Sequence, residues 1–450
     1  MLAGMKSLGP VVQPISGAMR SVCVLLQSHY ETDIRVTRKT QALVAAGYHV
    51  DVLALRSPFS TGRSYTVDGV NVHTISLGRK RGSLARYAFE YVAFFLWASF
   101  KLPMLMRKTR YAVIDVNNLP DFLVFAALWG KLRGAKVVFD MHEITPEFYM
   151  SKYEIGRASL PVRFLTFVEH FSMRFADHVI TINEPIQRLL ETRGLDPRKS
   201  TIITNSVDEE FFKVLEGPAG AAKSLTERPK FVMMYHGTLT HIYGLDIVIE
   251  AFGMVHQQMP GAELWILGEG PERAALEDLA RQRRLASKVK LLGTVRPLEI
   301  PAWLQQCHIG VLATRQDVFL DLSFSSKLSE YIIMGKAVIS SRIKTIRHYF
   351  SEDALAFVEP NQPADLARQM LNLYEQPDRR ACLAARASQE YGPIRWSVMR
   401  ERYLALMDRL TGNTASSRQE PCTRIAASPA GSVQQPVLTS ADVQDHANAR

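Results

Sequence analysis

A lysine and a glutamate, Lys327 and Glu330, lie one helical turn apart within the stretch 325–340. The stretch predicts a short helix that ends at Gly335, followed by an apolar run typical of a buried strand. A cation and a carboxylate on one helical face at such a junction could hold a phosphate and a sugar hydroxyl together. The same spacing also suits a local ion pair. The surrounding elements must therefore decide between a ligand site and a surface pair.

Two glycine-containing loops could add backbone donors to such a site. One loop contains Gly237 and Thr238, and the other contains Gly268 and Gly270. Each follows a predicted strand and precedes a predicted helix, where glycine lets a ligand approach the backbone and a helix N-terminus attracts anions. Arg273 stands where a nicotinamide-binding fingerprint has its third glycine, so that fingerprint is not met. Taken alone, each loop is equally well explained as a tight turn.

The first half of the chain offers a histidine and a carboxylate after another predicted strand. His142 and Glu143 follow the strand 136–140, and such side chains can orient hydroxyl groups or exchange protons near neutral pH. Asp33 and Arg35 lie in the loop after the first predicted strand. They could contact an acceptor or only cap the following helix. Open α/β sheets bind ligands at the carboxyl ends of their strands, so we expect these loops to form the site.

Strand-like and helix-like segments alternate along most of the chain, which predicts two doubly wound α/β domains with parallel sheets. The predicted helices include 36–46, 84–108, 121–132, 364–374 and 396–410. Apolar periodicity is lost between residues 213 and 229, where the composition is typical of a linker. We therefore expect an N-terminal arm at 1–20, a first domain at 21–212, a linker at 213–229, a second domain at 230–390, a helical segment at 391–411 and a disordered tail at 412–450.

The composition is that of a globular protein, with 47% hydrophobic and 22% charged residues among 450. A net charge of +10 favours anionic partners. The basic residues are dispersed and no recognition motif is present, so we do not expect nucleic-acid binding. The four cysteines show no C-x-x-C spacing, which argues against a disulfide framework or a zinc site and fits a reducing cytoplasm.

The segment 79–110 combines many aromatic side chains with lysines and arginines near its ends. A helix there could lie on an anionic membrane surface, or it could pack against the sheet. Its uncharged run, 91–100, is shorter than the about 20 residues that span a bilayer. Residues 1–20 contain no sustained apolar run, so we do not expect a secretory signal.

Together, these stretches resemble the motifs of the retaining glycosyltransferases of the GT4 family, over about residues 21–411. In the first half the matching motifs are Asp33-Ile-Arg-Val36, Val137-Val-Phe-Asp-Met-His-Glu143, Ala176-Asp-His-Val-Ile-Thr181 and Asn205-Ser-Val-Asp208. In the second half they are Tyr235-His-Gly-Thr-Leu239, Gly244-Leu-Asp246, Trp265-Ile-Leu-Gly-Glu-Gly-Pro271 and Ser326-Lys-Leu-Ser-Glu-Tyr331. The resemblance implies a GT-B fold: two Rossmann-like domains facing each other across a cleft, with a C-terminal helix that crosses back to the first domain.

The resemblance also implies roles for individual residues. The second domain would bind a nucleotide-sugar donor, with Glu330 on the ribose hydroxyls and Lys327 near the diphosphate. The remaining donor-side residues would be Gly237, Thr238, Gly268, Gly270 and Ser326. His142 corresponds to a histidine that contacts the transferred sugar, and Asp33, Arg35 and Glu143 would lie on the acceptor side.

The same resemblance implies the partners. They would be a nucleotide sugar and a glycan or lipid-linked acceptor. No metal or other cofactor is expected, because positive side chains and helix N-termini neutralise the leaving diphosphate. The implied location is the cytoplasm, on the inner face of the cytoplasmic membrane.

Two features depart from the family pattern. Leu322 replaces the first glutamate of the E-x7-E motif, and Asp321 is only adjacent. Thr238 and Tyr243 replace the basic residues of the usual phosphate clamp.

Three basic residues could substitute for that clamp: Lys327, Arg315 or Arg296. A K-L-x-E-Y form is similar to that of bacterial polysaccharide enzymes, so we expect an active transferase of that type. The alternatives are a non-catalytic sugar-nucleotide-binding subunit of a glycan-assembly complex and, third, a sugar-nucleotide epimerase of the same fold.

Overall fold

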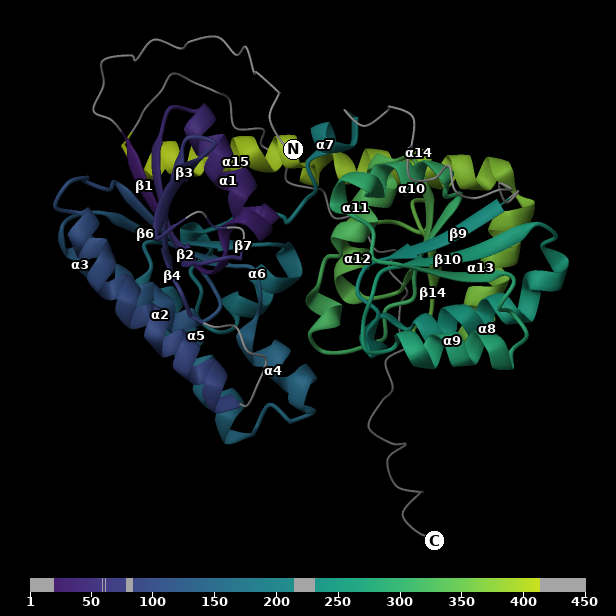
Figure 1. Cartoon of the computed structure of the whole chain (residues 1–450). Coiled ribbons are helices and arrows are strands. Elements are labelled where there is room, and N and C mark those ends of the chain that lie inside the picture. Colours follow the sequence, from purple (N-terminus) through teal and green to yellow (C-terminus); the bar gives the residue numbers. More distant parts are fainter. Residues whose placement is uncertain (1–19, 59, 61, 78–83, 214–230, 413–450) are drawn as a thin grey trace, which may run out of the picture. The chain divides into compact units, whose positions relative to one another are not determined.

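The computed structural model describes residues 20–58, 60, 62–77, 84–213 and 231–412 (Figure 1). The predicted arm, linker and tail lie almost wholly outside these residues, as do residues 79–83 of the segment 79–110. The described residues form two largely parallel sheets, each covered by helices. This confirms the predicted α/β class.

The first sheet has the strand order β3-β4-β2-β1-β5-β6-β7-β8. Only β3 runs antiparallel, paired with β4 at the sheet edge. The strands are β1 (Ser21–His29), β2 (His49–Leu55), β3 (Ser64–Val67), β4 (Val70–Ile75), β5 (Val113–Asn117), β6 (Lys136–Met141), β7 (His178–Thr181) and β8 (Ser200–Ile202). The associated helices are α1 (Ile34–Ala45), α2 (Leu84–Leu105), α3 (Leu128–Leu132), α4 (Thr145–Tyr153), α5 (Leu160–Phe175), α6 (Glu184–Glu191) and α7 (Glu209–Lys213).

The second sheet has the order β11-β10-β9-β12-β13-β14 and is parallel throughout. Its strands are β9 (Phe231–His236), β10 (Ala262–Leu267), β11 (Val289–Gly293), β12 (Ile309–Leu312), β13 (Ala337–Ser341) and β14 (Ala356–Val358). The helices of this half are α8 (Leu245–Val255), α9 (Arg273–Gln282), α10 (Ile300–Gln306), α11 (Ser326–Ile333), α12 (Lys344–Tyr349), α13 (Pro363–Glu375) and α14 (Pro377–Tyr391). One further helix, α15 (Trp396–Leu410), follows them.

Alternate residues of β1 enter two separate apolar clusters, because successive side chains of a strand point to opposite faces. Cys23 and Leu25 pack with residues of α2 and α5, whereas Val22 and Val24 pack with residues of α1 and α15. Each face of the first sheet is therefore covered by helices. Strands buried on both faces are near-continuous apolar runs, which is why the sequence revealed them.

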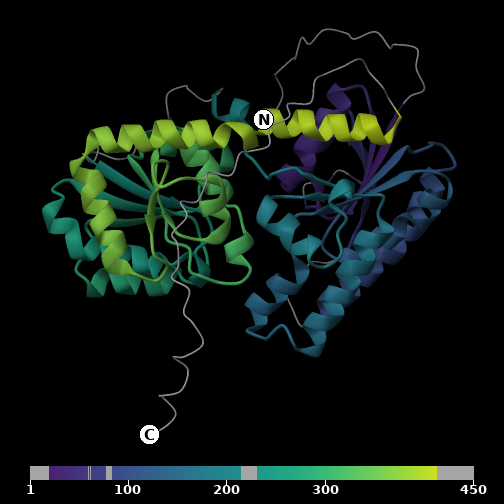
Figure 2. The same cartoon turned by 180° about the vertical axis from the view of Figure 1, so that it is seen from behind.

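The final helix, α15, belongs to the core of the first sheet. Its side chains Met399 and Tyr403 are fully buried there, and the Tyr403 hydroxyl donates to Asp115 Oδ2 on β5 at 2.9 Å. The expectation that the C-terminal helix crosses back to the first domain is confirmed; Figure 2 shows the helix from behind.

The prediction of an α-helix at 121–132 is wrong for most of these residues. Residues Asp121–Ala127 form a 3-10 helix, η2, and only Leu128–Leu132 is α-helical. Five of the seven residues of η2 are buried, and its two phenylalanines pair edge-on with rings of α2 and α5. Tight packing on several sides overrides the 3.6-residue periodicity on which the prediction depended.

Helix α2 has an unusual exposure pattern. The window Ala88–Leu105 is long and apolar enough to cross a membrane by length and composition, with a mean hydropathy of 1.2, and 22% of it is buried. It is the one such helix among the described residues. Phe94, Ala98 and Leu102 nevertheless form part of the first sheet's apolar cluster, so one face of α2 is a core face.

Candidate functional site

Glu330 and His236 meet at the carboxyl end of β9. His236 is the last residue of that strand, and Glu330 lies on α11, which precedes β13. His236 Nε2 and Glu330 Oε2 are 2.5 Å apart, and the two side chains are 6% and 18% exposed. The carboxylate therefore pairs with a histidine 94 residues away, rather than with Lys327 as a local ion pair would require.

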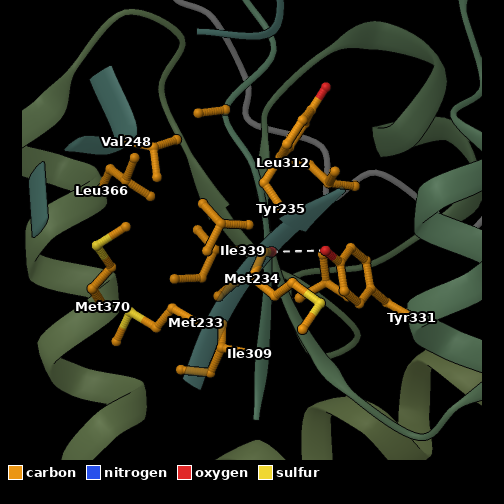
Figure 3. Close-up of a cluster of buried hydrophobic side chains, with 14 of the residues drawn as sticks. Met233, Met234, Tyr235, Val248, Ile309, Leu312, Tyr331, Ile339, Leu366 and Met370 are labelled. Carbon is orange, nitrogen blue, oxygen red and sulfur yellow. Dashed lines mark hydrogen bonds between the residues drawn. The ribbon is translucent and has the colours of Figure 1, made fainter. Parts of the chain in front are cut away.

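Tyr331 continues this contact into the sheet. Its hydroxyl donates to the Met234 carbonyl oxygen of β9 at 2.7 Å, shown as a dashed line in Figure 3, and lies 3.0 Å from His236 Nδ1. The tyrosine hydroxyl thus lies between the Met234 carbonyl oxygen and His236 Nδ1, while His236 Nε2 faces the Glu330 carboxylate. The carboxylate is thus oriented by a hydrogen-bond chain anchored on a buried strand.

Lys327 lies beside this chain in the first turn of α11. Its ammonium is 4.3 Å from the ring centroid of Tyr243 and 5.7 Å from that of Tyr235. Burial lowers the pKa of Lys327, and the negative charge of Glu330 opposes that shift. A cation in the first turn is unfavourable with respect to the helix dipole. A bound anion would remove that cost, so the arrangement suits a phosphate ligand.

The glycine loops show a clear packing reason for their composition. Gly237 has φ +130° and Gly268 has φ +133°, a region that favours glycine. A Cβ on Gly237 would lie 2.1 Å from Lys327 Cε, and one on Gly268 would lie 1.9 Å from the Gly237 carbonyl oxygen. A Cβ on Gly270 would likewise lie only 2.2 Å from the Leu239 carbonyl oxygen. The glycines therefore bring two loops and the Lys327 stem into direct contact.

Some backbone donors of these loops are engaged within the protein. Gly237 N donates to the Leu267 oxygen at 2.8 Å, and Gly268 N donates to the Gly293 oxygen at 2.7 Å. These two amides are therefore not free to contact a ligand, and the donor-side roles of Gly237, Gly268 and Gly270 stay predictions. Thr238 and Ser326, the first residue of α11, are exposed, and their roles stay predictions.

Two of the three candidate phosphate-clamp residues are occupied elsewhere. Arg315 Nη2 is 2.5 Å from Asp246 Oδ2, and Arg296 forms an exposed pair with Glu299. Lys327 thus remains as the candidate. Leu322 is 7% exposed, and its carbonyl oxygen accepts from Asn183 Nδ2 at 2.9 Å, so an apolar side chain packs where the family has its first glutamate.

The first sheet places His142 at the carboxyl end of β6. Asn118, which follows β5, fixes this loop: its Oδ1 accepts from the amides of His142 and Glu143 at 3.1 and 3.3 Å. Its Nδ2 donates to the Glu143 carbonyl oxygen at 2.6 Å. Asp121 accepts from Asn118 and from Thr145, at 3.0 and 2.9 Å.

His142 itself is poised as a neutral group. Burial lowers its pKa well below the usual range, and the positive charges of Arg35 and Lys39 lower it further. Its Nδ1 is buried without a hydrogen-bond partner among the described residues. Burial raises the pKa of the neighbouring Glu143, and Arg35 opposes that shift. A neutral imidazole with an unused nitrogen can accept from, or donate to, a ligand hydroxyl.

Asp33 caps the helix α1. Its Oδ1 accepts from Val36 N at 3.4 Å, and Arg35 Nη2 is 2.8 Å from its Oδ2. The structure thus shows the capping alternative for Asp33, with Arg35 turned to Asp33 and close enough to affect His142 and Glu143 electrostatically.

Sequence reasoning missed the residues that hold the predicted ones in place, namely His236 and Tyr331 in the second sheet and Asn118 and Asp121 in the first. It also missed the buried Asn117. Asn117 is 1% exposed, and neither polar atom of its side chain has a partner among the described residues. His236 lies within a family motif but had no expected role; a polar residue ending an otherwise apolar strand is the signal that could have identified it.

No group of three or more His, Cys, Asp or Glu side chains among the described residues could hold a metal ion. The expectation of a metal-independent reaction stays a prediction.

Two family models match the chain in tandem. "Glycosyl transferase 4-like domain" matches residues 33–206, and "Glycosyl transferases group 1" matches residues 230–376. The chain belongs to the GT4 family of retaining glycosyltransferases. The first GT4 model contains strands β2 to β8 of the first sheet, and the second contains the whole second sheet. The expectation from the sequence motifs is confirmed.

The GT4 relatives are distant in sequence. The chain is 22% identical over 329 residues to the phosphatidylinositol N-acetylglucosaminyltransferase gpi3 subunit of Schizosaccharomyces pombe, covering 73% of this chain and 66% of that protein. It is 21% identical over 237 residues to the D-inositol 3-phosphate glycosyltransferase of Thermomonospora curvata, covering 49% of this chain and 54% of that protein. The chain therefore spans between about half and just under two thirds of the length of these relatives.

Solved structures show the same fold. Sucrose-phosphate synthase from Thermosynechococcus elongatus has a TM-score of 0.67 at 16% identity, covering 87% of this chain and all of that one. HepE of Anabaena in complex with UDP has a TM-score of 0.62 at 16% identity, covering 86% and 100%. These likenesses confirm the GT-B fold.

Proposed function

We propose that this GT4 protein transfers a sugar from a nucleotide sugar to a glycan or lipid-linked acceptor, with retention at the anomeric carbon. The biological setting is polysaccharide or glycolipid biosynthesis, of the bacterial polysaccharide type. The observation that best supports this proposal is that His236 and Tyr331 hold the Glu330 carboxylate in a fixed position next to Lys327. A fixed carboxylate suits vicinal ribose hydroxyls, and an adjacent cation suits a diphosphate.

UDP is the first nucleotide to test, because the Anabaena neighbour was solved with UDP and with UDP-glucose. His142, with its unused nitrogen, would contact the sugar near the reacting carbon. The acceptor would approach from the side of Asp33, Arg35 and Glu143.

The decisive experiment incubates the purified chain with a panel of nucleotide sugars, with and without lipid-linked and free glycan acceptors. We expect acceptor-dependent release of nucleotide and, by NMR, a product with the donor's anomeric configuration. Failure to release nucleotide from every donor in the panel, together with failure to bind any of them, would overturn the activity. Binding without turnover, together with co-purification of a partner enzyme, would favour the non-catalytic subunit instead.

The proposed location is the cytoplasm, with peripheral attachment to the inner face of the cytoplasmic membrane. A lipid-linked acceptor would require the enzyme to work at that surface. Fractionation of cells expressing the tagged chain, with a carbonate wash to release peripheral proteins, tests this location. Recovery of the chain only in the carbonate-resistant pellet would contradict it.

A further inference from the structure

Helices α2 and α5 each expose an apolar stripe on the side opposite their core face. On α2, Phe89, Leu96, Phe100 and Met104 are 49–72% exposed. At 3.6 residues per turn these positions lie across the helix from Phe94, Ala98 and Leu102, which pack into the first sheet's core. Packing against the sheet thus explains why one face of α2 is apolar, but it does not explain the apolar residues on the exposed face.

Helix α5 repeats the pattern. Leu160, Phe164, Phe167 and Phe171 follow one another at helical spacing and are 46–78% exposed. Glu169 and Met173, on the other face, are buried. Helix α5 lies well outside the segment 79–110, for which a membrane surface was expected, so it is an independent occurrence of the same feature.

The exposed stripes belong to one layer. Both helices cover the same face of the first sheet, and both pack against η2, through the ring pairs Phe95–Phe122 and Phe125–Phe175. Figures 1 and 2 both show α2 and α5 next to each other. The short helix α3, which continues η2, adds Leu128, Trp129 and Leu132 at 46–68% exposure. Soluble proteins rarely expose so many large apolar side chains on neighbouring helices.

The exposed charged side chains of helices α2, α3 and α5 are all positive. The acidic residues of the three helices are Glu90 and Glu169, and both are buried. Exposed basic residues lie on α5 as Arg163 and Arg174, and just beyond α2 as Lys108 and Arg110. Aromatic and aliphatic side chains edged by lysine and arginine are the composition of surfaces that insert shallowly among anionic lipids.

We propose that the outer face of α2, α3 and α5 docks on an anionic lipid bilayer, with the apolar stripes in the headgroup and upper acyl region. The core face of α2 stays on the sheet, so docking is peripheral. The positive edge selects anionic over zwitterionic lipid. This surface does not depend on the chemistry proposed above, and its test requires neither donor nor acceptor.

The test measures flotation of the full chain with vesicles of phosphatidylcholine alone or mixed with phosphatidylglycerol. We expect binding to the mixed vesicles that weakens with salt, and little binding to the neutral ones. Phe164→Ser with Phe167→Ser should reduce the bound fraction at least tenfold. The matched control, Met254→Ser with Leu298→Ser, removes exposed apolar side chains from the second half and should bind as the wild type does.

Arg163→Glu with Arg174→Glu separates the charge from the apolar contribution. It should reduce binding to mixed vesicles about tenfold or more. Equal wild-type binding to both vesicle types would overturn the anionic preference. Unchanged binding of the Phe164/Phe167 variant would overturn the docking face.

Self-association is the competing use of this face. A wild-type dimer that becomes a monomer in the Phe164/Phe167 variant, measured by light scattering without lipid, together with absent vesicle binding, would assign the face to a second copy and overturn the proposal. Thermal unfolding of each variant, expected to match the wild type because the substituted side chains are exposed, excludes misfolding.

Discussion

The two halves of the candidate site differ in how their polar groups are satisfied. In the second sheet, Glu330, His236, Tyr331 and Met234 form a closed chain of hydrogen bonds. In the first sheet, His142 Nδ1 and both side-chain polar atoms of Asn117 are buried without partners among the described residues. Buried polar groups normally have partners. The side chain of Glu330 is thus fixed by contacts within the protein, whereas His142 and Asn117 have buried polar atoms that a ligand could contact.

This contrast predicts that the largest effect on turnover comes from the half with unused polar groups. His142→Ala should lower kcat about a hundredfold, because removal of one preorganised polar contact to a transition state has effects of that size. The nucleotide Kd should stay unchanged, since the nucleotide would bind at the second sheet. Steady-state kinetics and calorimetry measure the two quantities. His142→Gln, which keeps a hydrogen-bonding group, should recover part of the rate; a shifted Kd with normal kcat would reverse the assignment.

Glu330→Ala should have the largest effect on nucleotide binding. Loss of a charge-assisted hydrogen bond costs about 1.5–3 kcal/mol, which corresponds to an increase in Kd of about ten- to a hundredfold. Calorimetry with the nucleotide diphosphate measures it. Glu375→Ala, at the exposed end of α13, is the control and should bind normally. Unchanged affinity in Glu330→Ala would show that the carboxylate has another role.

His236→Gln tests whether the closed chain orients Glu330. The amide can replace one of the two ring contacts, so we expect Kd to rise about fivefold, the size of one net hydrogen bond. Tyr331→Phe removes only the hydroxyl and should give a comparable or smaller rise. If both variants bind as tightly as the wild type, Glu330 is positioned by α11 alone.

The smallest effect is a pH dependence from Lys327. Burial lowers its pKa, so its positive charge is lost at a lower pH than that of an ordinary lysine, about 10.4. As pH rises, affinity for an anionic diphosphate should therefore decline before that value. Lys327→Arg keeps its charge throughout this range, and its affinity should stay flat in the same titration. A parallel decline in both proteins would assign the effect to another group.

The fold was largely readable because most strands of the two sheets are buried on both faces. Runs such as 49–55 and 262–267 are apolar enough to be recognised without any partner. The edge strand β3 was missed because its exposed alternation, over four residues, resembles a loop. Helix α14 was missed for a similar reason, since only three of its 15 residues, Leu383, Ala387 and Tyr391, are buried.

The site was predictable as a set of residues but not as a set of contacts. Lys327 and Glu330 were visible from their spacing, yet the partner of Glu330 comes from a strand 94 residues earlier. Asn118 reaches His142 through backbone amides that any residue types would supply. Contacts between distant segments depend on register and loop path, which local periodicity does not contain.

Helix α15 has a consequence for the order of events during synthesis. Its residues Trp396, Met399 and Tyr403 complete the apolar cluster that also contains Val22 of β1 and Val50 of β2. Those strands are translated well before the side chains of α15 that cover them. Domains usually fold as units beginning with the N-terminal one. Here the cluster on this face of the first sheet is completed only when α15 has been translated, well after the strands that it covers.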